Sequence, residues 1–589
     1  MILVFGGTTE GRLAVKVLEE SGASYFYSTR GDTQDIELVH GHHVTGAMEV
    51  PEMATFCHEH NIRLIVDAAH PFAVNLHRNV VDLAGQISVP VIRFDRIYPP
   101  HDKDLVWCKD YTDAIHQLEQ HGIERLLALT GVNTIGRLRA FWQEHECWFR
   151  ILHREESKAE AQKTGFPIDH LVFYEKDDTA ALIEQLCPQA ILTKESGMSG
   201  GFVEKVEAAR QAEVKIFVVE RPDYPTAKGV LVEHVNGPHG LRRMVEKLLP
   251  EFYPLHSGLT TGTCATAAAI AATIRLTTGE MPEQVPVLLP DSETIHVPVS
   301  YGEGYAAVFK EAGDDPDVTN GIEIRASVES SDQFEIHGGE GVGRFTVPGF
   351  DFPPGESAIN KAPRQMMRDN IHENVSITIS VPEGAAIARR TFNPRLGIEG
   401  GISIIGVSGI VKPFSEEAFI DSIRKCMQVA KASGSDRVII NSGGKSERFV
   451  KAQYPDLPQQ AFVEYGNYIG ETLNIAHELG IENITLGVML GKAVKLAAGN
   501  LDTHSRHATM DKEFVKSMLH EADCDIDISD LTLARELWKR IPQEKLQAFA
   551  MVIIDHCAQY CEPLLPGGHL TILLIDDKGK IYSKEVLRR

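Results

Sequence analysis

The sequence predicts an α/β protein in which two Rossmann-like lobes with parallel sheets are followed by an α+β part and a final α/β part. Short apolar runs alternate with segments of helical period at both ends of the chain, which is the pattern of βαβ units. A middle stretch instead alternates apolar and polar residues and contains many Gly and Pro residues, as antiparallel sheets do. The pattern changes at Pro250 and Pro254, so we place the main boundary there.

In the N-terminal half, short apolar runs have the length and flanks of strands, and longer segments have the period of helices. The expected strands are Ile2–Phe5, Ser24–Tyr27, Ile62–Val66, Val89–Phe94, Leu126–Leu129, Leu171–Phe173, Ala190–Thr193 and Ile216–Val219. The expected helices are Leu13–Glu20, Ala180–Leu186 and Phe202–Ala212. We therefore expect two α/β lobes in residues 1–250, with a boundary between them near residues 100–125.

In the C-terminal half, residues 256–589, the α+β part is expected over about 256–412 and the α/β part over about 413–589. The α+β part has an Ala-rich helix, Ala265–Leu276, and alternating strands at Val285–Leu289, Ile295–Val299, Ala306–Phe309 and Val375–Val381. The α/β part is expected to contain helix Glu416–Ala432, strand Arg437–Asn441, helix Gln459–Leu479, strand Asn483–Met489 and a helix near Lys492–Ala498.

Composition limits the function classes. Asp and Glu outnumber Lys and Arg by 82 to 58, and the net charge of -24 disfavours nucleic acid or an anionic membrane as the partner. The nine cysteines include no C-x-x-C pair, so we expect neither a zinc site nor a disulfide framework. The sequence opens on a strand-like run instead of a leader, and no stretch reaches the ~18 apolar residues of a membrane span. We therefore expect a cytoplasmic protein.

The first predicted strand leads directly into a glycine-rich turn and a helix, whose N-terminus is suited to the pyrophosphate of a dinucleotide. The candidate contact residues are Gly6, Gly7, Thr8, Thr9, Gly11 and Arg12. The second strand leads into Ser28-Thr29-Arg30, where NAD-binding folds place an acidic residue. Ser28 and Arg30 suit a 2′-phosphate and favour NADPH, with NADH left open. The alternatives are a plain turn and a solvated arginine.

Polar groups also follow three later strands, in Asp67–Ala73, Thr130–Thr134 and Thr193–Gly197. The carboxyl ends of parallel strands share one edge of a sheet, so these groups can face one cleft. His70 is a candidate catalytic residue there, and Lys194 is a candidate partner for an anionic substrate. The alternatives are a helix-capping or core histidine and a surface ion pair.

Five segments together resemble the precorrin-6A reductase family in order and spacing over about residues 1–250: Ile2–Arg12, Asp67–Ala73, Thr130–Thr134, Thr193–Phe202 and Glu220-Arg221-Pro222. The resemblance implies that a reduced nicotinamide delivers hydride to one carbon–carbon double bond of a corrinoid held between the two lobes. Such a substrate carries many carboxylates, which would give Lys194 and Arg221 a role as its partners.

Four strings in the C-terminal half are rich in glycine, hydroxyl or carboxylate groups: Thr260–Cys264, Gly313–Gly321, Asn393–Pro413 and Gly491–Ser505. Thr261 lies at a helix start that is suited to a carboxylate, with ordinary capping as the alternative. The carboxylates of Gly313–Gly321 lack the spacing of an EF-hand, so a turn or a polar loop that faces the substrate is favoured over a metal loop. Gly443-Gly444-Lys445-Ser446 lacks the first glycine of a Walker loop, which argues against an NTPase and leaves adenosine-type ligands open.

Together, these four strings closely resemble the cobalt-precorrin-5B C1-methyltransferase family over about residues 256–589. The resemblance implies S-adenosylmethionine as the methyl donor and C-1 of a ring-contracted tetrapyrrole as the acceptor, with cobalt only as part of the substrate. The candidates for the donor site are Gly443, Gly444, Gly487 and Gly491. The candidates for binding the macrocycle are Thr261, Lys492 and Lys495, and His504 is a second candidate catalytic residue that could equally cap a helix.

The product implied for the C-terminal half, cobalt-precorrin-6A, is the substrate implied for the N-terminal half. We therefore expect a bifunctional enzyme of corrin ring synthesis that forms cobalt-precorrin-6A and reduces it to cobalt-precorrin-6B. The alternative is a single nicotinamide-dependent oxidoreductase with a non-catalytic, corrinoid-binding C-terminal half. The expected partners are small corrinoids, and a homo-oligomer is left open.

Overall fold

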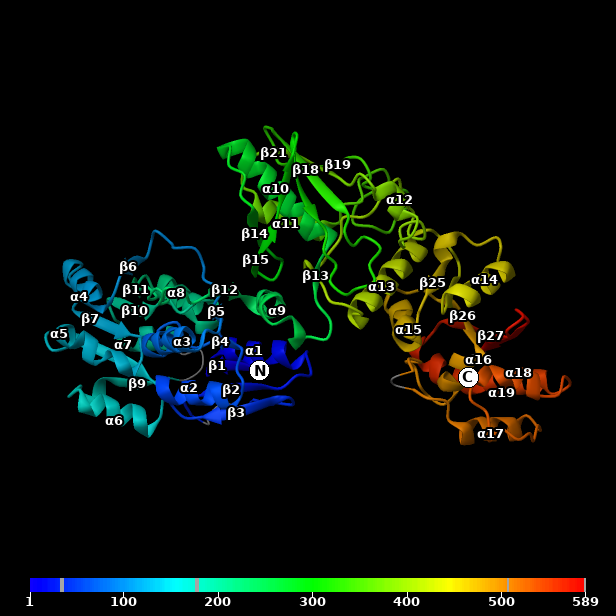
Figure 1. The fold of residues 1–589 in the computed structure, drawn as a ribbon, viewed down its shortest axis with the longest axis horizontal. Helices are drawn as coiled ribbons and strands as arrows, with labels where there is room; N and C mark the ends of the chain where they lie inside the picture. The colour runs from blue at the N-terminus through cyan, green and yellow to red at the C-terminus, as the bar shows by residue number, and fades with distance from the viewer. Residues whose placement is uncertain (32–35, 175–178, 506–507, 587–589) are drawn as a thin grey trace. The chain divides into compact units, whose positions relative to one another are not determined.

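The computed structural model describes residues 1–31, 36–174, 179–505 and 508–586, which form two compact units (Figure 1). The first unit contains Met1–His256 and Leu288–His296, and the second contains Ser257–Val287 and the chain from Val297 onward. Among the described helices, none is long and apolar enough to cross a membrane.

The first unit opens with a six-stranded sheet of parallel strands in the order β12-β5-β4-β1-β2-β3. Its strand order reverses between β1 and β4, and ligands of open α/β sheets bind outside the carboxyl ends of strands at such a point. The strands are β1 (Ile2–Phe5), β2 (Tyr25–Thr29), β3 (Gly41–Thr45), β4 (Leu64–Asp67), β5 (Val91–Asp95) and β12 (Val232–Asn236). The helices are α1 (Thr9–Glu19), α2 (Val50–Glu59), α3 (Val74–Ile87) and α9 (Gly237–Leu248).

The second sheet of this unit is also parallel, in the order β6-β11-β10-β7-β8-β9, and reverses between β7 and β10. Its strands are β6 (Val106–Cys108), β7 (Arg125–Ala128), β8 (Glu146–Ile151), β9 (Leu171–Phe173), β10 (Ala190–Lys194) and β11 (Lys215–Val219). Its helices are α4 (Tyr111–Gln120), α5 (Arg139–Trp142), α6 (Glu155–Lys163), α7 (Thr179–Leu186) and α8 (Phe202–Gln211). The two sheets confirm the predicted pair of parallel-sheet lobes.

The chain returns to the first sheet after completing the second. Strand β12 pairs with β5 at the edge of the first sheet, and α9 then packs against α1. The sequence analysis did not predict this return, because Val232–Asn236 is a half-buried edge strand with polar residues among its apolar ones.

The second unit begins with α10 (Thr261–Thr278), which packs with α11 (Lys361–Asn370) and against β17 and β18. These strands belong to a mixed sheet in the order β16-β17-β18-β21-β19, in which only β19 and β21 pair in parallel. Its strands are β16 (Ser300–Gly302), β17 (Tyr305–Phe309), β18 (Glu323–Ser330), β19 (Glu335–Gly338) and β21 (Val375–Ser380). The short elements are β13 (Gly258–Leu259) with β23 (Ile410–Val411), β20 (Arg344–Phe345) with β22 (Ile398–Glu399), and α12 (Gly384–Ala388). A further pair, β14 (Gln284–Leu288) with β15 (Thr294–Pro298), belongs to both units, because its segment Leu288–His296 is part of the first.

A five-stranded sheet completes the second unit, in the order β25-β24-β26-β27-β28, with only the last pair antiparallel. Its strand order reverses between β24 and β26. The strands are β24 (Val438–Asn441), β25 (Phe462–Glu464), β26 (Asn483–Met489), β27 (His569–Ile575) and β28 (Ile581–Val586). The helices are α13 (Glu416–Ala432), α14 (Gly444–Gln453), α15 (Ile469–Glu478), α16 (Leu490–Ala497), α17 (Lys512–Glu521), α18 (Leu537–Arg540) and α19 (Leu546–Cys561).

The segment Gln459–Leu479, predicted as one helix, is divided in the structure, and that prediction is wrong. Its first residues form a 3-10 turn and strand β25, and only α15 is helical. Gly466, at φ +56, interrupts the segment between them. A short buried apolar run has the same local pattern in a strand as in a helix, which explains the error. The correction places Glu464 at the carboxyl end of a strand.

Candidate active sites

The loop between β1 and α1 is a tight, glycine-containing turn at the carboxyl end of β1. Gly7 has φ +90, and a Cβ on Gly6 would lie 2.2 Å from the buried Tyr27 ring, so both positions require glycine. The Thr8 hydroxyl caps α1 and donates to the Ala68 carbonyl at 2.6 Å. These contacts hold the loop against β2 and the end of β4, with the start of α1 at the point where the strand order reverses.

The other residues predicted to contact the nucleotide lie around this loop. Gly11 is buried, and a Cβ there would come within 2.9 Å of the loop backbone. Arg12 donates to the Thr9 hydroxyl at 3.2 Å on the first turn of α1. Ser28 is buried near the end of β2, and Arg30 is exposed directly after this strand. The structure thus brings these residues to one edge of the first sheet.

A buried charge network lies at the end of β4. Asp67 accepts hydrogen bonds from Tyr224 at 2.8 Å, Arg93 at 3.2 Å and His77 Nδ1 at 2.6 Å. His77 Nε2 lies 3.0 Å from the His70 carbonyl, so both ring nitrogens lie close to oxygen atoms of the network. Burial raises the pKa of Asp67, but its bond to His77 and the cationic charges together hold it below its ordinary value. The network fixes the loop that carries His70.

His70 is a neutral hydrogen-bond donor. Its Nδ1 accepts from the Phe72 N–H at 3.2 Å, which leaves the ring proton on Nε2. Burial, followed by the charges of Arg96, Lys194 and Lys205, lowers the pKa of His70 to about 3. At neutral pH the ring therefore offers one N–H and carries no charge.

Lys194 and Lys205 are half-buried cations, and neither forms an ion pair with a carboxylate in the part of the chain that the structure describes. The Lys194 ammonium lies 5.2 Å from the centroid of the Phe72 ring, and Lys205 donates to the Gly200 carbonyl at 3.2 Å. Burial is the largest cause that lowers the pKa of both lysines, to about 8. Two uncompensated cations next to His70 are suited to an anionic ligand.

Arg221 has a closer anionic partner. Its guanidinium forms an ion pair with the buried Glu195 carboxylate, and its backbone N–H donates to the same group at 2.9 Å. The guanidinium also lies 3.8 Å from the centroid of the Tyr98 ring. Much of its charge is therefore compensated, which leaves Lys194 as the stronger anion partner of the two.

In the second unit, Thr261 is only 4% exposed at the start of α10. Its hydroxyl lies 3.1 Å from the Ser403 carbonyl and 3.2 Å from that of Ile405, and it accepts the Ile405 N–H at 2.8 Å. These bonds fasten the string Asn393–Pro413 to α10. The hydroxyl thus holds a loop that borders the pocket described below.

The predicted glycines of the second unit have different surroundings. Gly443 and Gly444, at φ +80 and +53, lead from β24 into α14, and a Cβ on Gly443 would lie 2.2 Å from the Glu464 carboxylate. Gly491 is exposed near the start of α16, after β26. Gly487 is buried inside β26, where a Cβ would meet a side chain of α14 at 2.6 Å. Gly443 and Gly491 therefore follow β24 and β26, the two strands between which the strand order reverses. Gly487 instead allows α14 to pack closely against β26.

Two lysines and a histidine lie at the same edge of this sheet. Lys492 donates to the Gly466 carbonyl just after β25, and burial is the largest cause that lowers its pKa, to about 8. Lys495 donates to the Thr503 carbonyl at 3.1 Å. His504 follows directly and is half-buried. The structure thus gathers these three predicted residues near the ends of β24, β25 and β26.

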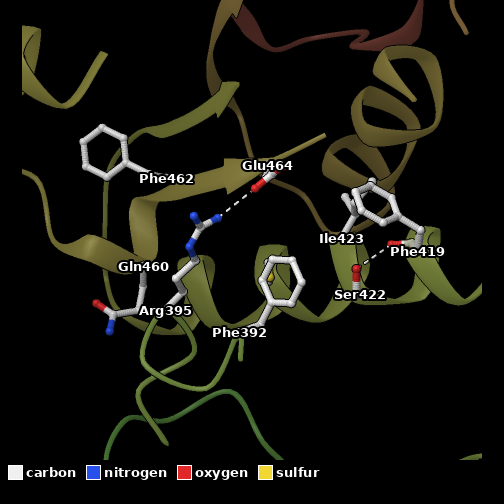
Figure 2. Close-up of a pocket in the computed structure, with 9 residues that line it drawn as sticks. Phe392, Arg395, Phe419, Ser422, Ile423, Gln460, Phe462 and Glu464 are labelled. Atoms are coloured by element: carbon white, nitrogen blue, oxygen red, sulfur yellow. Dashed lines mark hydrogen bonds and ion pairs between the residues drawn. The ribbon is translucent and has the colours of Figure 1, made fainter. Parts of the chain in front are cut away.

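A pocket also opens at this edge, between Asn393–Pro413, α13 and the end of β25 (Figure 2). Arg395 crosses it and binds Glu464 and Glu447, each at 2.9 Å. Figure 2 shows Phe462 on one side of the Arg395 guanidinium and further aromatic rings on the other. These rings belong to Phe392 and Phe419.

Sequence reasoning did not select Glu464 or the partners of Asp67 as site residues. Glu464 follows Gly443 by about 20 residues in the neighbouring strand, which is the spacing at which dinucleotide-binding folds carry a ribose-binding acid. That signal was hidden by the predicted helix Gln459–Leu479. His77 carries no such signal, because only the fold brings α3 against the end of β4.

Family models match three parts of the chain. The model described as precorrin-6x reductase CbiJ/CobK matches residues 1–237, CbiD matches 250–413, and the CbiD C-terminal domain matches 502–585. The cobalt-precorrin-5B C(1)-methyltransferase of Prosthecochloris aestuarii is 40% identical over 345 residues, covering 54% of this chain and 94% of the relative. A Geobacillus protein of the same name is 40% identical over 356 residues, covering 56% of this chain and 97% of the relative.

Two solved structures are also similar. The cobalamin biosynthesis protein (cbiD) from Archaeoglobus fulgidus is 30% identical, with a TM-score of 0.26, and the match covers 43% of this chain and 83% of that one. A CobK precorrin-6A reductase is 19% identical, with a TM-score of 0.34, and the match covers 42% of this chain and 97% of that one.

Proposed function

Because this chain belongs to the cobalt-precorrin-5B C(1)-methyltransferase family and also contains a precorrin-6x reductase part, we propose the cofactors and side chains that each part uses. The protein is a bifunctional enzyme of cobalamin biosynthesis. The methyltransferase part forms cobalt-precorrin-6A from cobalt-precorrin-5B, and the reductase part converts that product to cobalt-precorrin-6B. The observation that carries this assignment is that the two families match separate, consecutive parts of one chain.

For the reductase part, we propose NADPH, with NADH as the alternative. The two glycines and the capped start of α1 fit a pyrophosphate that approaches the backbone closely. Arg30 is exposed where a 2′-phosphate would lie, with Thr9 and Arg12 on the adjoining turn of α1. A reduced nicotinamide supplies a hydride when bound, so the protein has to orient the cofactor and the corrinoid.

We propose that the corrinoid of the reductase part binds next to His70 and Lys194. Lys194 pairs with a carboxylate of the macrocycle, and Arg221 contributes more weakly because Glu195 compensates its charge. The neutral His70 donates one hydrogen bond to the substrate from Nε2. The charge network around Asp67 and His77 keeps this ring in place.

For the methyltransferase part, we propose S-adenosylmethionine as the donor, bound at the edge that carries Gly443, Gly444 and Gly491. Gly443 and Gly444 present the start of α14 to the ligand, and Gly487 keeps α14 close to the sheet. The sulfonium supplies an activated methyl group when bound, so alignment is the main task of the protein. Lys492, Lys495 and His504 face the macrocycle, Thr261 holds the neighbouring loop, and cobalt arrives within the substrate.

Mass spectrometry of the corrinoid tests this function. Purified full-length protein is incubated anaerobically with cobalt-precorrin-5B and S-adenosylmethionine, with and without NADPH or NADH. We expect a gain of one methyl group without nicotinamide and of two further hydrogens with it. The absence of methyl transfer to intact substrate would contradict the methyltransferase assignment, and the reductase part is then tested separately on cobalt-precorrin-6A.

A further inference from the structure

The carboxylate of Glu464 lies directly over the glycine turn after β24. A Cβ on Gly443 would meet this carboxylate at 2.2 Å, so the carboxylate can take this place only because residue 443 is glycine, which the φ of +80 also favours. The turn begins α14, a helix of ten residues, whose first N–H groups point toward the same edge. An acid at the end of the strand beside a glycine turn is the arrangement that binds the hydroxyls of a nucleoside ribose.

Three phenylalanines are among the nine residues that line the pocket next to Glu464. Phe462 lies on one side of the Arg395 guanidinium, and Phe392 and Phe419 lie on the other (Figure 2). Aromatic rings suit a flat purine base and a sulfonium cation, which is attracted to their faces. The pocket therefore combines a carboxylate for hydroxyl groups with rings for a base and a cation.

The thiol of Cys426 also lines this pocket. Burial is the largest cause that raises the pKa of its thiol to about 11, so it stays protonated at neutral pH. A protonated thiol is a poor nucleophile, which makes it compatible with a methylating ligand.

Arg395 forms an ion pair with Glu464, the carboxylate that such a ligand would need for its hydroxyl groups. It binds Glu464 and Glu447 at 2.9 Å each, and the side chains of Arg395 and Glu464 are 33% and 26% exposed. The pair with Glu464 keeps more solvent contact than the pair with Glu447, whose side chain is 9% exposed, so a ligand can replace the Glu464 pair more readily. Glu447 would keep Arg395 anchored after such an exchange.

We propose that Glu464 binds the ribose hydroxyls of an adenosine-containing methyl donor, and that Arg395 holds this carboxylate until the ligand replaces it. The proposal rests on the function proposed above and assigns it a binding residue. It makes Glu464 a determinant of affinity for the nucleoside part, and it makes Arg395 a competitor of the ligand.

Calorimetric titration of the full-length protein with S-adenosylhomocysteine tests both roles. Loss of a charged hydrogen bond weakens binding about tenfold to 100-fold, so we expect Glu464→Gln to have an effect of that size. Arg395→Met should bind as tightly as the wild type or several-fold more tightly. The matched control is Glu478→Gln, which breaks a comparable pair with Arg424 on α13 and α15 and should leave affinity unchanged.

A second ligand separates a direct contact from a structural effect. The 2′,3′-dideoxy analogue of S-adenosylhomocysteine lacks the two hydroxyls, so it should bind the wild type about tenfold or more weakly than the parent compound. In Glu464→Gln this difference should disappear. An equal difference in both proteins overturns the role of Glu464, and a tenfold or greater loss of affinity in Arg395→Met overturns the exchange.

Failure of this inference is distinguishable from failure of the proposed function. If the wild type binds S-adenosylhomocysteine and methylates cobalt-precorrin-5B while Glu464→Gln binds normally, only the inference fails. If the wild type neither binds the nucleoside nor transfers a methyl group, the proposed function itself fails. Far-UV circular dichroism and thermal unfolding of each variant, measured in parallel, verify that the second unit, which carries the substitutions, is folded.

Discussion

At the scale of single residues, Gly6 shows how one missing side chain shapes a binding loop. A Cβ there would lie 2.2 Å from the Tyr27 ring. We predict that Gly6→Ala displaces the loop and lowers kcat/KM for reduction roughly 100-fold, because small displacements of bound groups cost about that much. Steady-state reduction of cobalt-precorrin-6A measures the effect. Gly136→Ala is the control, since its Cβ would lie 4.0 Å from its nearest neighbour, and equal losses in both variants would contradict the prediction.

Lys194 is the residue to which we assign substrate affinity in the reductase part. Replacing it with methionine keeps an apolar side chain on Phe72 but removes the charge. We predict that Lys194→Met raises KM for cobalt-precorrin-6A about tenfold, the size expected for one charge-assisted hydrogen bond. Lys163→Met is the control, because Lys163 is 72% exposed and pairs with Glu160. Unchanged KM in Lys194→Met would remove this residue from the substrate site.

Lys194 and its neighbour Lys205 should make the affinity for the substrate depend on pH. Lys194 and Lys205 both have a pKa of about 8, so they are charged below that pH and neutral above it. Carboxylate binding should therefore be fully present near neutral pH and decline as pH rises through 8. The measurement is KM for cobalt-precorrin-6A across this range in wild type and Lys194→Met, and a wild-type KM that falls with rising pH would contradict it.

The charge network at Asp67 shows where residue-level prediction stops. The string Asp67–Ala73 indicated a polar strand end, and the structure confirms that Asp67 is the last residue of β4. Its partners Arg93, Tyr224 and His77 come from β5, from a loop after the second sheet and from α3. No spacing in the sequence relates these positions, because packing of separate elements brings them together.

At the scale of elements, the Thr261 hydroxyl in the first turn of α10 attaches the loop of residues 403–405 to this helix. We predict that Thr261→Val removes the hydrogen-bond partner of the Ser403 carbonyl and of the Ile405 N–H, and destabilises this contact by about 1–3 kcal/mol. Hydrogen–deuterium exchange should then be faster in these residues and at the start of α10. Thr277→Val is the control, because Thr277 bonds only to carbonyls of its own helix. Equal exchange in the two variants would show that the Thr261 bonds do not hold the loop.

The elements that were predicted well have a long or uniform pattern. Helix α13 and strand β26 have the bounds expected from the sequence, since one has seventeen residues of helical period and the other a continuous buried run. Strand β25 has three residues and was absorbed into a predicted helix. This error also concealed Glu464, so the clearest loss in the candidate site came from one misassigned element.

At the scale of the whole molecule, the two activities depend on separate sets of residues. We predict that full-length Lys194→Met and full-length Glu464→Gln, mixed in equal amounts, convert cobalt-precorrin-5B to cobalt-precorrin-6B, although each alone is slow in one step. Mass spectrometry of the corrinoids over time measures this, with each variant alone as the control. A mixture no faster than the slower variant would mean that the intermediate does not pass between chains.

Strand β12 determines the order in which the first unit can be completed during synthesis. The first sheet begins at Ile2, yet its edge strand β12 and helix α9 leave the ribosome only after the whole second sheet has been made. Domains generally fold as units while the chain emerges. The second sheet can therefore close first, and a nascent chain that ends before Val232 exposes the free edge of β5 to other strands.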